Sequence, residues 1–290
     1  MELRDQRTGY LMVAPALIAL TVLIAYPFVL SIYFSLSDKR IGLPGHFIGL
    51  QNFEALAQDS TFQQTLFNTG LYTVVSVGLK LVLGLTLAML LEKVVRGQRL
   101  LRGIILLPWV IPASLSTLAW RWMFDPSYSV FNWCLRVVGY NAGIPWLSDP
   151  WWARAAVISV NVWRGLPFFA ICLLAGLVSI PKEFYEAARV DGAGPRARFW
   201  YVTLPLLKPI LGIVLLYSII MTVSDFVVVQ VLTRGGPLQS THLLATLAYR
   251  IGLAGSRLGM GAAITLFLFP VLVVGAYVLL RIVRKGEEYA

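Results

Sequence analysis

Six polar or aromatic side chains interrupt two otherwise apolar stretches of this sequence and have the chemistry of a ligand site. They are Asn161, Trp163, Arg164, Ser224, Asp225 and Gln230. An indole ring can stack on the C–H face of a sugar, while amide, hydroxyl and charged groups bond the sugar's hydroxyls. Polar groups inside an apolar segment are costly and therefore count as functional candidates. We expect these residues to lie along the path of a polar solute.

Other roles for the same residues stay open at this stage. Asp225 and Arg164 could pair with each other or with another subunit, and Asn161 could form an interhelical hydrogen bond without any ligand. Lys80 could bond a carbonyl of a neighbouring helix or line a water-filled path. If Arg164 is unpaired, an anionic sugar is favoured, whereas the nearby Asp225 favours a neutral sugar or a polyol.

The composition indicates the elements that hold these residues. The chain has 290 residues, of which 58% are hydrophobic and 13% charged, and its mean hydropathy is +0.75. A soluble domain is typically about 25% charged, and a helical membrane span needs about 20 apolar residues. The sequence therefore predicts an all-α membrane protein with six transmembrane helices. The predicted spans are 11–36, 66–91, 103–123, 155–179, 206–232 and 262–284.

Two features of these spans bear on function. The first span is too long for the core of a signal peptide and lacks a small-residue cleavage site, so we expect a retained helix. The fourth and fifth spans run in opposite directions, and Asn161 and Asp225 each lie six residues from a span centre. Both residues are therefore expected at one depth, roughly 9 Å from the middle of the membrane.

The distribution of basic residues predicts the orientation of the chain. Fourteen Lys and Arg residues, Arg96 among them, fall on one side of the predicted spans, and eight fall on the other. Basic residues accumulate on the cytoplasmic side of membrane proteins, so both termini and the loop at 180–205 are predicted to be cytoplasmic. The net charge of +10 then reflects topology and does not indicate nucleic-acid binding.

The loop at 180–205 contains the longest polar stretch in the second half of the chain. Its sequence EFYEAARVDGAG predicts a short helix that begins near Pro181 and stops at Gly192 and Gly194. A second short helix is expected from Pro195 to about Val202. Helical spacing places one set of side chains on a common side; these are Phe184, Ala187, Ala188 and Asp191. Such a surface suits docking into a groove of a soluble partner, although a simple solvated turn remains the alternative.

The same loop resembles the EAA signature of binding-protein-dependent ABC importer permeases, E-A-A-x3-G-x9-I-x-L-P. Glu186, Ala187 and Ala188 match its start, Gly192 matches its glycine, and the end matches except that Val202 stands where isoleucine is usual. Further resemblance, to the sugar-importer branch, covers nearly the whole chain. It rests on Tyr10 to Leu17, Tyr26-Pro27, Gly49 to Phe53, Asn68-Thr69, Trp163 to Pro167, Ile180-Pro181, Asp191 to Ala193, Thr233 to Pro237 and Gly261 to Ala263.

This resemblance implies a fold, partners and roles for residues. The fold would be the type I ABC importer permease fold in a bacterial inner membrane, with both termini inside. The partners would be a second permease, two ATPase subunits and a periplasmic or lipid-anchored binding protein that delivers a sugar. The coupling positions that dock on the ATPase would be Glu186, Ala187, Ala188 and Gly192, with Phe184 and Asp191 beside them. The chain would have no cofactor of its own, because ATP and magnesium would be bound by the ATPase.

The division along the chain follows from these assignments. Residues 1–65 would form the first transmembrane helix and an amphipathic outer segment, in which Phe47, Leu50, Phe53 and Leu56 recur at helical spacing. Residues 66–284 would form the permease core, including the coupling loop at 180–205. Residues 285–290 would form a cytoplasmic tail.

Three other classes of protein remain to be weighed against this one. An ion-coupled secondary transporter would need intramembrane acids, and only Asp225 lies well inside a predicted span. An intramembrane enzyme is not favoured, because the sequence has no H-E-x-x-H, no G-x-S-x-G and no cluster with metal-ligand spacing. A structural scaffold would leave the signature at 186–205 without an explanation.

Overall fold

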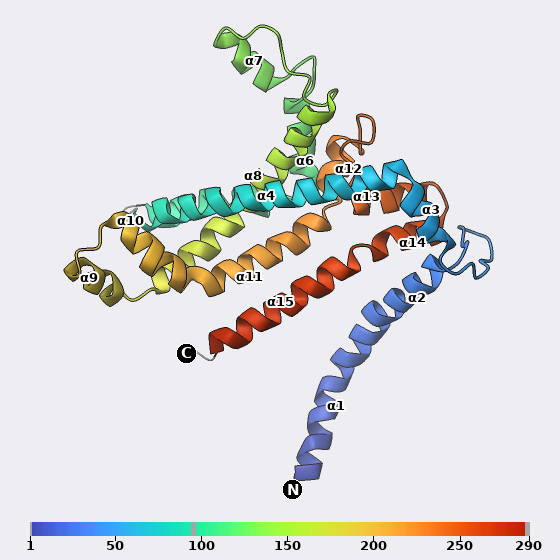
Figure 1. Ribbon diagram of the computed structural model, residues 1–290, viewed down its shortest axis with the longest axis horizontal. Coiled ribbons are helices and arrows are strands. Elements are labelled where there is room, and N and C mark those ends of the chain that lie inside the picture. Colours follow the sequence, from blue (N-terminus) through green and yellow to red (C-terminus); the bar gives the residue numbers. More distant parts are fainter. Residues whose placement is uncertain (1, 94–96, 288–290) are drawn as a thin grey trace. The chain divides into compact units, whose positions relative to one another are not determined.

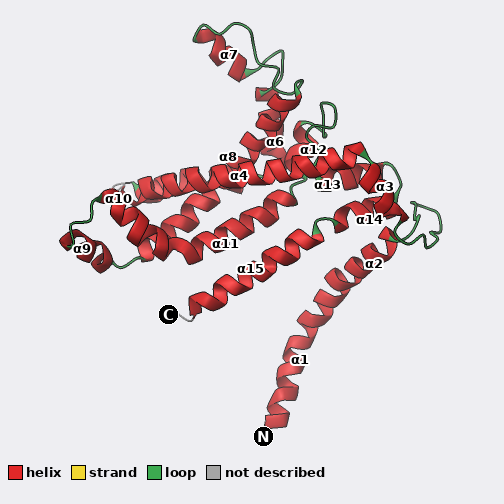
Figure 2. Ribbon diagram, viewed as in Figure 1, coloured by secondary structure: helices red, strands yellow, loops and turns green. Residues whose placement is uncertain are grey.

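The computed structural model describes residues 2–93 and 97–287, and over these ranges the chain is helical (Figure 1). Arg96 and the last three residues of the predicted tail at 285–290 lie outside these ranges. Figure 2 shows helices joined by loops, and the described residues contain no strand, only an isolated antiparallel bridge between Ser37 and Phe47. The prediction of an all-α protein is confirmed.

The number of membrane-spanning helices also agrees with the sequence. Among the described residues, five helices are long and apolar enough to cross a membrane, and a sixth is counted if one bent pair forms a single span. The long helices cover Met12–Ser35, Ser60–Lys93, Pro150–Ser179, Pro195–Leu232 and Leu258–Gly275. The bent pair consists of Gln98–Val110 and Ala113–Met123, at an angle of 87°.

The chain divides into two compact units. The first contains 1–63 and 247–267, and the second contains 64–246 and 268–290. The predicted division kept 247–267 with the core at 66–284, whereas the structure groups this segment with the N-terminal helix. Glycine makes this grouping possible, because α14 (Leu258–Leu266) lies so close to the end of α2 (Tyr26–Ser35) that a side chain on Gly259 would overlap the carbonyl of Ser37.

The first unit begins with a continuous helix made of α1 (Glu2–Leu20) and α2 (Tyr26–Ser35), joined by a π-helical turn at Thr21–Ala25. Pro27 is the second residue of α2, in the first turn after this segment. Because proline lacks an N–H and its ring clashes with the preceding turn, such widened turns accommodate it within a helix. The helix ends at Ser35, where the side-chain amide of Asn52 donates to the carbonyls of Ser35 and Ser37, both at 2.8 Å.

The remaining helices of the first unit pack around a small aromatic cluster. They are α3 (Gln51–Gln58), a π-helical segment at Tyr249–Ala254 that continues α13 (Leu244–Ala248), and α14 (Leu258–Leu266). Phe267 packs against Phe62 and Phe53, with ring centroids 4.8 and 5.9 Å apart. The predicted amphipathic helix thus begins at Gln51, so Phe47 is not part of it; Phe47 lies in the bridge with Ser37 instead.

The second unit contains the other helices of the described chain, including those that line the candidate site. They are α4 (Ser60–Lys93), α5 (Gln98–Val110), α6 (Ala113–Met123), α7 (Val130–Val137), α8 (Pro150–Ser179), α9 (Lys182–Val190), α10 (Pro195–Arg198), α11 (Leu204–Val223), α12 (Val227–Leu232) and α15 (Phe269–Glu287). Helix α8 packs against both α5 and α11, and α11 also packs against α15 (Figure 1). Asp149 caps α8 by accepting from the backbone N–H groups of Trp151 and Trp152, so this helix starts at Pro150, earlier than the predicted 155.

Two helix breaks differ from the predicted spans. The third predicted span is split at Ile111, which is extended (ψ 133°) because a residue before proline disfavours helical geometry. The fifth predicted span is split between α11 and α12, where Ser224, Asp225 and Phe226 interrupt the helix. At its other end, α10 continues into α11 through a π-helical turn at Phe199–Thr203, so the predicted end of the second short helix near Val202, ahead of Pro205, is wrong.

Two apolar clusters form the core of the second unit. One includes Phe124, Val160 and Val228, and the other includes Phe169, Leu173 and Leu207. On α8 the first cluster uses residues up to Val160 and the second begins at Phe169. The residues between them on α8 therefore belong to neither cluster, and a polar layer lies at this level.

Candidate functional site

A chain of hydrogen bonds links three helices within this polar layer. The ammonium group of Lys80 on α4 donates to the Asn161 side-chain oxygen on α8 at 3.0 Å, and to the Thr222 hydroxyl on α11 at 2.8 Å. Lys80 is only 4% exposed. Its aliphatic stem lies against Gly165, where an added Cβ would come within 2.6 Å of the Lys80 Cδ. The small residue on α8 thus makes room for the lysine.

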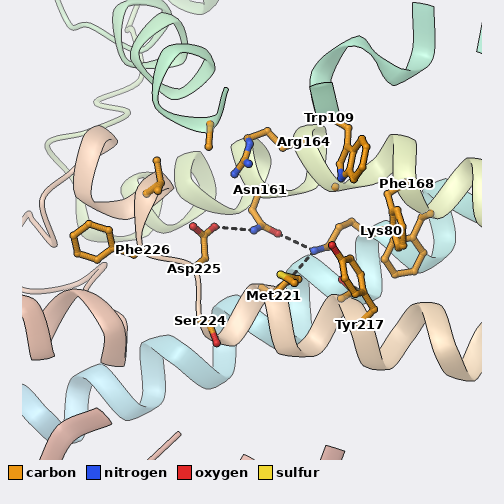
Figure 3. Close-up of a pocket in the computed structure, with 16 residues that line it drawn as sticks. Lys80, Trp109, Asn161, Arg164, Phe168, Tyr217, Met221, Ser224, Asp225 and Phe226 are labelled. Atoms are coloured by element: carbon orange, nitrogen blue, oxygen red, sulfur yellow. Dashed lines mark hydrogen bonds between the residues drawn. The ribbon is translucent and has the colours of Figure 1, made fainter. Parts of the chain in front are cut away.

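Asp225 extends this chain from the break between α11 and α12. Its Oδ2 accepts from the Tyr72 hydroxyl at 2.7 Å and from the Asn161 amide at 2.9 Å. Its Oδ1 accepts from the backbone N–H of Val228 at 3.3 Å, in the first turn of α12. The carboxylate therefore satisfies free backbone and side-chain donors around the broken helix. Figure 3 shows Asp225, Asn161 and Lys80 in a row, joined by these bonds.

A cavity of about 330 Å³ opens along this row. Its polar wall includes Lys80, Asn161, Arg164, Ser224 and Asp225 (Figure 3). Its aromatic wall is built from Trp109, Phe168 and Tyr217. Phe168 connects the other two rings, with centroid distances of 6.1 Å to Trp109 and 4.6 Å to Tyr217. The volume lies at the lower end of the range for small-molecule sites, roughly 300–1,000 Å³.

Arg164 is the second cation that lines the cavity. It lies three residues after Asn161 on α8, and both residues line the cavity (Figure 3). Its Nε is buried and has no hydrogen-bond partner. Among the described residues, Arg164 and Asp225 do not form an ion pair with each other.

The structure brings together four of the six residues singled out from the sequence. Asn161, Arg164, Ser224 and Asp225 all line the cavity, and the hydrogen bond between Asn161 and Asp225 agrees with their expected common depth. The other two are not among the residues that line it. Trp163 packs edge-on against Trp120 with centroids 5.4 Å apart, and Gln230 lies on α12.

Sequence reasoning missed Tyr72, Thr222 and the aromatic wall. A signal for the α4 contribution does exist, because polar residues recur along this helix at spacings of four, three and four, as expected for one helix face. These residues are Thr69, Thr73, Ser76 and Lys80, and all are buried. The hydroxyls of Thr73 and Ser76 have no hydrogen-bond partner among the described atoms. The aromatic wall has no comparable signal, because its residues come from three different helices.

A second candidate surface lies on α9, in the loop predicted for docking. Pro181 precedes the helix, which ends in a glycine cap: Gly192 adopts φ +78°, and Ala193 N–H donates to the Ala188 carbonyl at 2.8 Å. Phe184 is 50% exposed and Val190 is 89% exposed, and Glu186, Ala187 and Asp191 are exposed as well. Tyr185 faces the other way and its hydroxyl lies 3.1 Å from that of Thr203. Helix α9 thus presents apolar and charged side chains on an open surface.

Comparison with known proteins relates this chain to membrane components of transport systems. A family model described as "Binding-protein-dependent transport system inner membrane component" matches residues 80–286. The chain is 38% identical to the sulfoquinovosyl glycerol transport system permease protein SmoG of Agrobacterium fabrum, covering 99% of this chain and 94% of that one. It is 35% identical to the trehalose/maltose transport system permease protein MalF of Thermococcus litoralis, covering 99% and 97%.

A solved structure shares the fold. It belongs to a bacterial ABC transporter involved in the import of the acidic polysaccharide alginate, with a TM-score of 0.81 and 24% identity. The superposition covers 99% of this chain and 97% of that chain. The expected type I importer permease fold is therefore confirmed.

Proposed function

This chain belongs to the family of binding-protein-dependent transport system inner membrane components, and on this premise we propose that it is a permease subunit of an ATP-driven sugar importer. The transported solute is a sugar or a sugar derivative, delivered by an extracytoplasmic binding protein. Both full-length relatives described above are permease proteins of sugar or sugar-derivative transport systems. Their role is transport, so the chain is not expected to catalyse a reaction.

One observation carries this proposal. The segment that matches the family, 80–286, contains both the cavity between α8 and α11 and the exposed helix α9. A membrane protein that only pairs helices needs neither a polar cavity nor an apolar surface on a short loop helix. An importer needs both, because the solute must pass through the membrane and the passage must be driven from one side.

The proposed coupling surface is α9. Phe184 would supply an apolar anchor in a cleft of the ATPase, and Glu186 and Asp191 would set its orientation. Ala187 and Ala188 would allow close approach of the two backbones, and Gly192 ends the helix so that the loop can turn back toward α10. The division of the chain follows: 1–65 is an N-terminal helix with its outer segment, 66–284 is the permease core with the coupling loop at 180–205, and 285–290 is a tail.

The proposed assembly contains this chain, a second permease, two ATPase subunits and a binding protein. Energy would come from ATP and magnesium bound by the ATPase, because this sequence has no G-x4-G-K-[ST] loop. Closure of the ATPase pair would move α9 and its counterpart as rigid bodies, and α8 and α11 would transmit this movement to the cavity.

The test is uptake by the assembled importer in proteoliposomes. Uptake of a labelled sugar should require ATP, the ATPase and the binding protein, and Glu186→Lys should reduce uptake while the cavity remains intact. Exchange of Glu183 for Lys, in the first turn of the same helix, is the matched control for added positive charge. An ion-coupled secondary transporter is the competing function, and uptake by this chain alone under a proton or sodium gradient would establish it instead.

A further inference from the structure

The charges that line the cavity do not balance. Of its lining residues, Lys80 and Arg164 carry positive charge, and Asp225 alone carries negative charge. At full ionisation the cavity wall therefore has an excess of one positive charge. Within a membrane-spanning segment, an unbalanced charge is costly unless a ligand or a partner neutralises it.

The carboxylate of Asp225 is already engaged by neutral donors. Its two oxygens accept from Tyr72, from Asn161 and from the backbone N–H of Val228. These bonds fix Asp225 at the break between α11 and α12 and occupy most of its capacity to accept hydrogen bonds. Asp225 therefore stabilises the helix break. Among the described residues, neither Lys80 nor Arg164 is in direct contact with its carboxylate.

Lys80 and Arg164 each have a hydrogen-bond donor without a partner in the described structure. An ammonium group has three donors, and Lys80 uses two of them on the neutral oxygens of Asn161 and Thr222. A guanidinium group has five donors in a planar fork, which suits acidic groups with two or more oxygens. The Nε of Arg164 is buried and has no partner in the described structure. Both side chains come from the α4 and α8 wall of one cavity.

The rest of the cavity suits a ring. Trp109, Phe168 and Tyr217 form an aromatic wall next to Lys80 (Figure 3). A sugar ring can stack its C–H face on such a wall while its hydroxyls bond Asn161 and Ser224. The volume of about 330 Å³ is sufficient for a small sugar.

We propose that this cavity selects sugars that carry an acidic group, with Arg164 and Lys80 as the counter-charges and the aromatic wall holding the ring. The inference rests on the proposed uptake function and deepens it. The acidic group is a sulfonate, a phosphate or a carboxylate, because all three present oxygens to the same donors. The relative SmoG, at 38% identity, is by its name a permease of a sulfoquinovosyl glycerol transport system, which is in line with this chemistry.

The experiment compares four forms of one hexose: the neutral sugar, its 6-sulfonate, its 6-phosphate and its 6-carboxylate. Binding to the assembled permease and ATPase complex is measured by calorimetry without the binding protein, so that the binding protein's own selectivity does not enter. We expect at least one acidic form to bind about tenfold more tightly than the neutral sugar. Arg164→Gln should remove most of this preference, and Arg164→Lys should retain part of it.

A control variant is available on the same helix, α8. Arg154→Gln also removes a guanidinium from α8, but Arg154 lies outside this cavity and bonds Asn68, so the preference should not change. Equal binding of all four sugars, no binding of any of them, or an equal loss for all four in Arg164→Gln would overturn the inference. ATP-dependent uptake without preference for an acidic form would refute the selectivity and leave the uptake function in place. Absence of ATP-dependent uptake of any sugar would refute the uptake function itself.

Discussion

Asn161 on α8 joins two opposite charges that do not touch each other. Its amide nitrogen donates to Asp225 at 2.9 Å, and its oxygen accepts from Lys80 at 3.0 Å. Because one end of an amide donates and the other accepts, this side chain can satisfy a carboxylate and an ammonium group at once. The pair Asn161 and Asp225 thus holds α8 against the break between α11 and α12.

Replacement of Asn161 by alanine should leave both charged neighbours with a lost bond. We expect the unfolding free energy of the purified complex to fall by about 1–3 kcal/mol, the range for a buried polar group left without its partner. Thermal unfolding in detergent measures this change. Gln230→Ala, outside the residues that line the cavity, is the control. An equal shift in both variants would contradict the role given to Asn161.

Tyr72→Phe should weaken the hold on Asp225 while the ring remains in the apolar core. The hydroxyl donates to Asp225 at 2.7 Å, and the side chain is 3% exposed. Loss of a hydrogen bond to a charged group should cost about 1.5–3 kcal/mol of unfolding free energy. Tyr128→Phe provides the matched control, because this tyrosine is 85% exposed. If the two exchanges have the same effect on thermal unfolding, the bond to Asp225 is not a stabilising contact.

Gly165→Ala should displace Lys80. The new Cβ would lie within 2.6 Å of the Lys80 Cδ, so the lysine must move away from Asn161 and Thr222. ATP-dependent uptake should fall, although alanine is the better helix former. Gly78→Ala on α4 is the control, because a Cβ there meets no atom within 4 Å. This exchange should leave uptake unchanged, and unchanged uptake in Gly165→Ala would show that the position of Lys80 is unimportant.

Gly192→Ala should disturb the end of α9. Gly192 adopts φ +78°, a conformation that costs a residue with a Cβ roughly 1–2 kcal/mol. The ATPase should then co-purify less with the permease, because the loop that presents α9 is altered. Gly194→Ala is the control, since Gly194 has φ −68° and open space around it. Normal recovery of the ATPase with Gly192→Ala would argue against the proposed coupling surface.

The sequence was sufficient to predict those parts of the site that depend on position along a single helix. Hydropathy predicted the spans, and counting from their centres placed Asn161 and Asp225 at one depth, in agreement with their hydrogen bond. The helix α9 was predicted from the proline that precedes it and the glycines that follow it. These features are local, because helical rise and capping depend on a few neighbouring residues.

The features that escaped prediction depend on contacts between helices. The break at Ser224 to Phe226 contains no proline or glycine, and it is stabilised by Asp225 bonding a tyrosine on α4 and a backbone N–H on α12. Trp163, expected in the ligand path, packs edge-on against Trp120 of α6 instead. Pro205 did not end the second short helix, since a π-helical turn directly before it accommodates the ring.

The polar layer between the two apolar clusters has a mechanical consequence. Sliding closely packed apolar surfaces past each other opens voids, whereas amides, hydroxyls and charged groups can exchange partners, including water, across a layer that already contains space. The two apolar clusters of the second unit can therefore shift relative to each other with the least loss of packing at the level of Lys80, Asn161 and Asp225. Under the proposed coupling role of α9, a movement of this helix would shift the neighbouring helices at this layer first, and both apolar clusters would keep their internal packing.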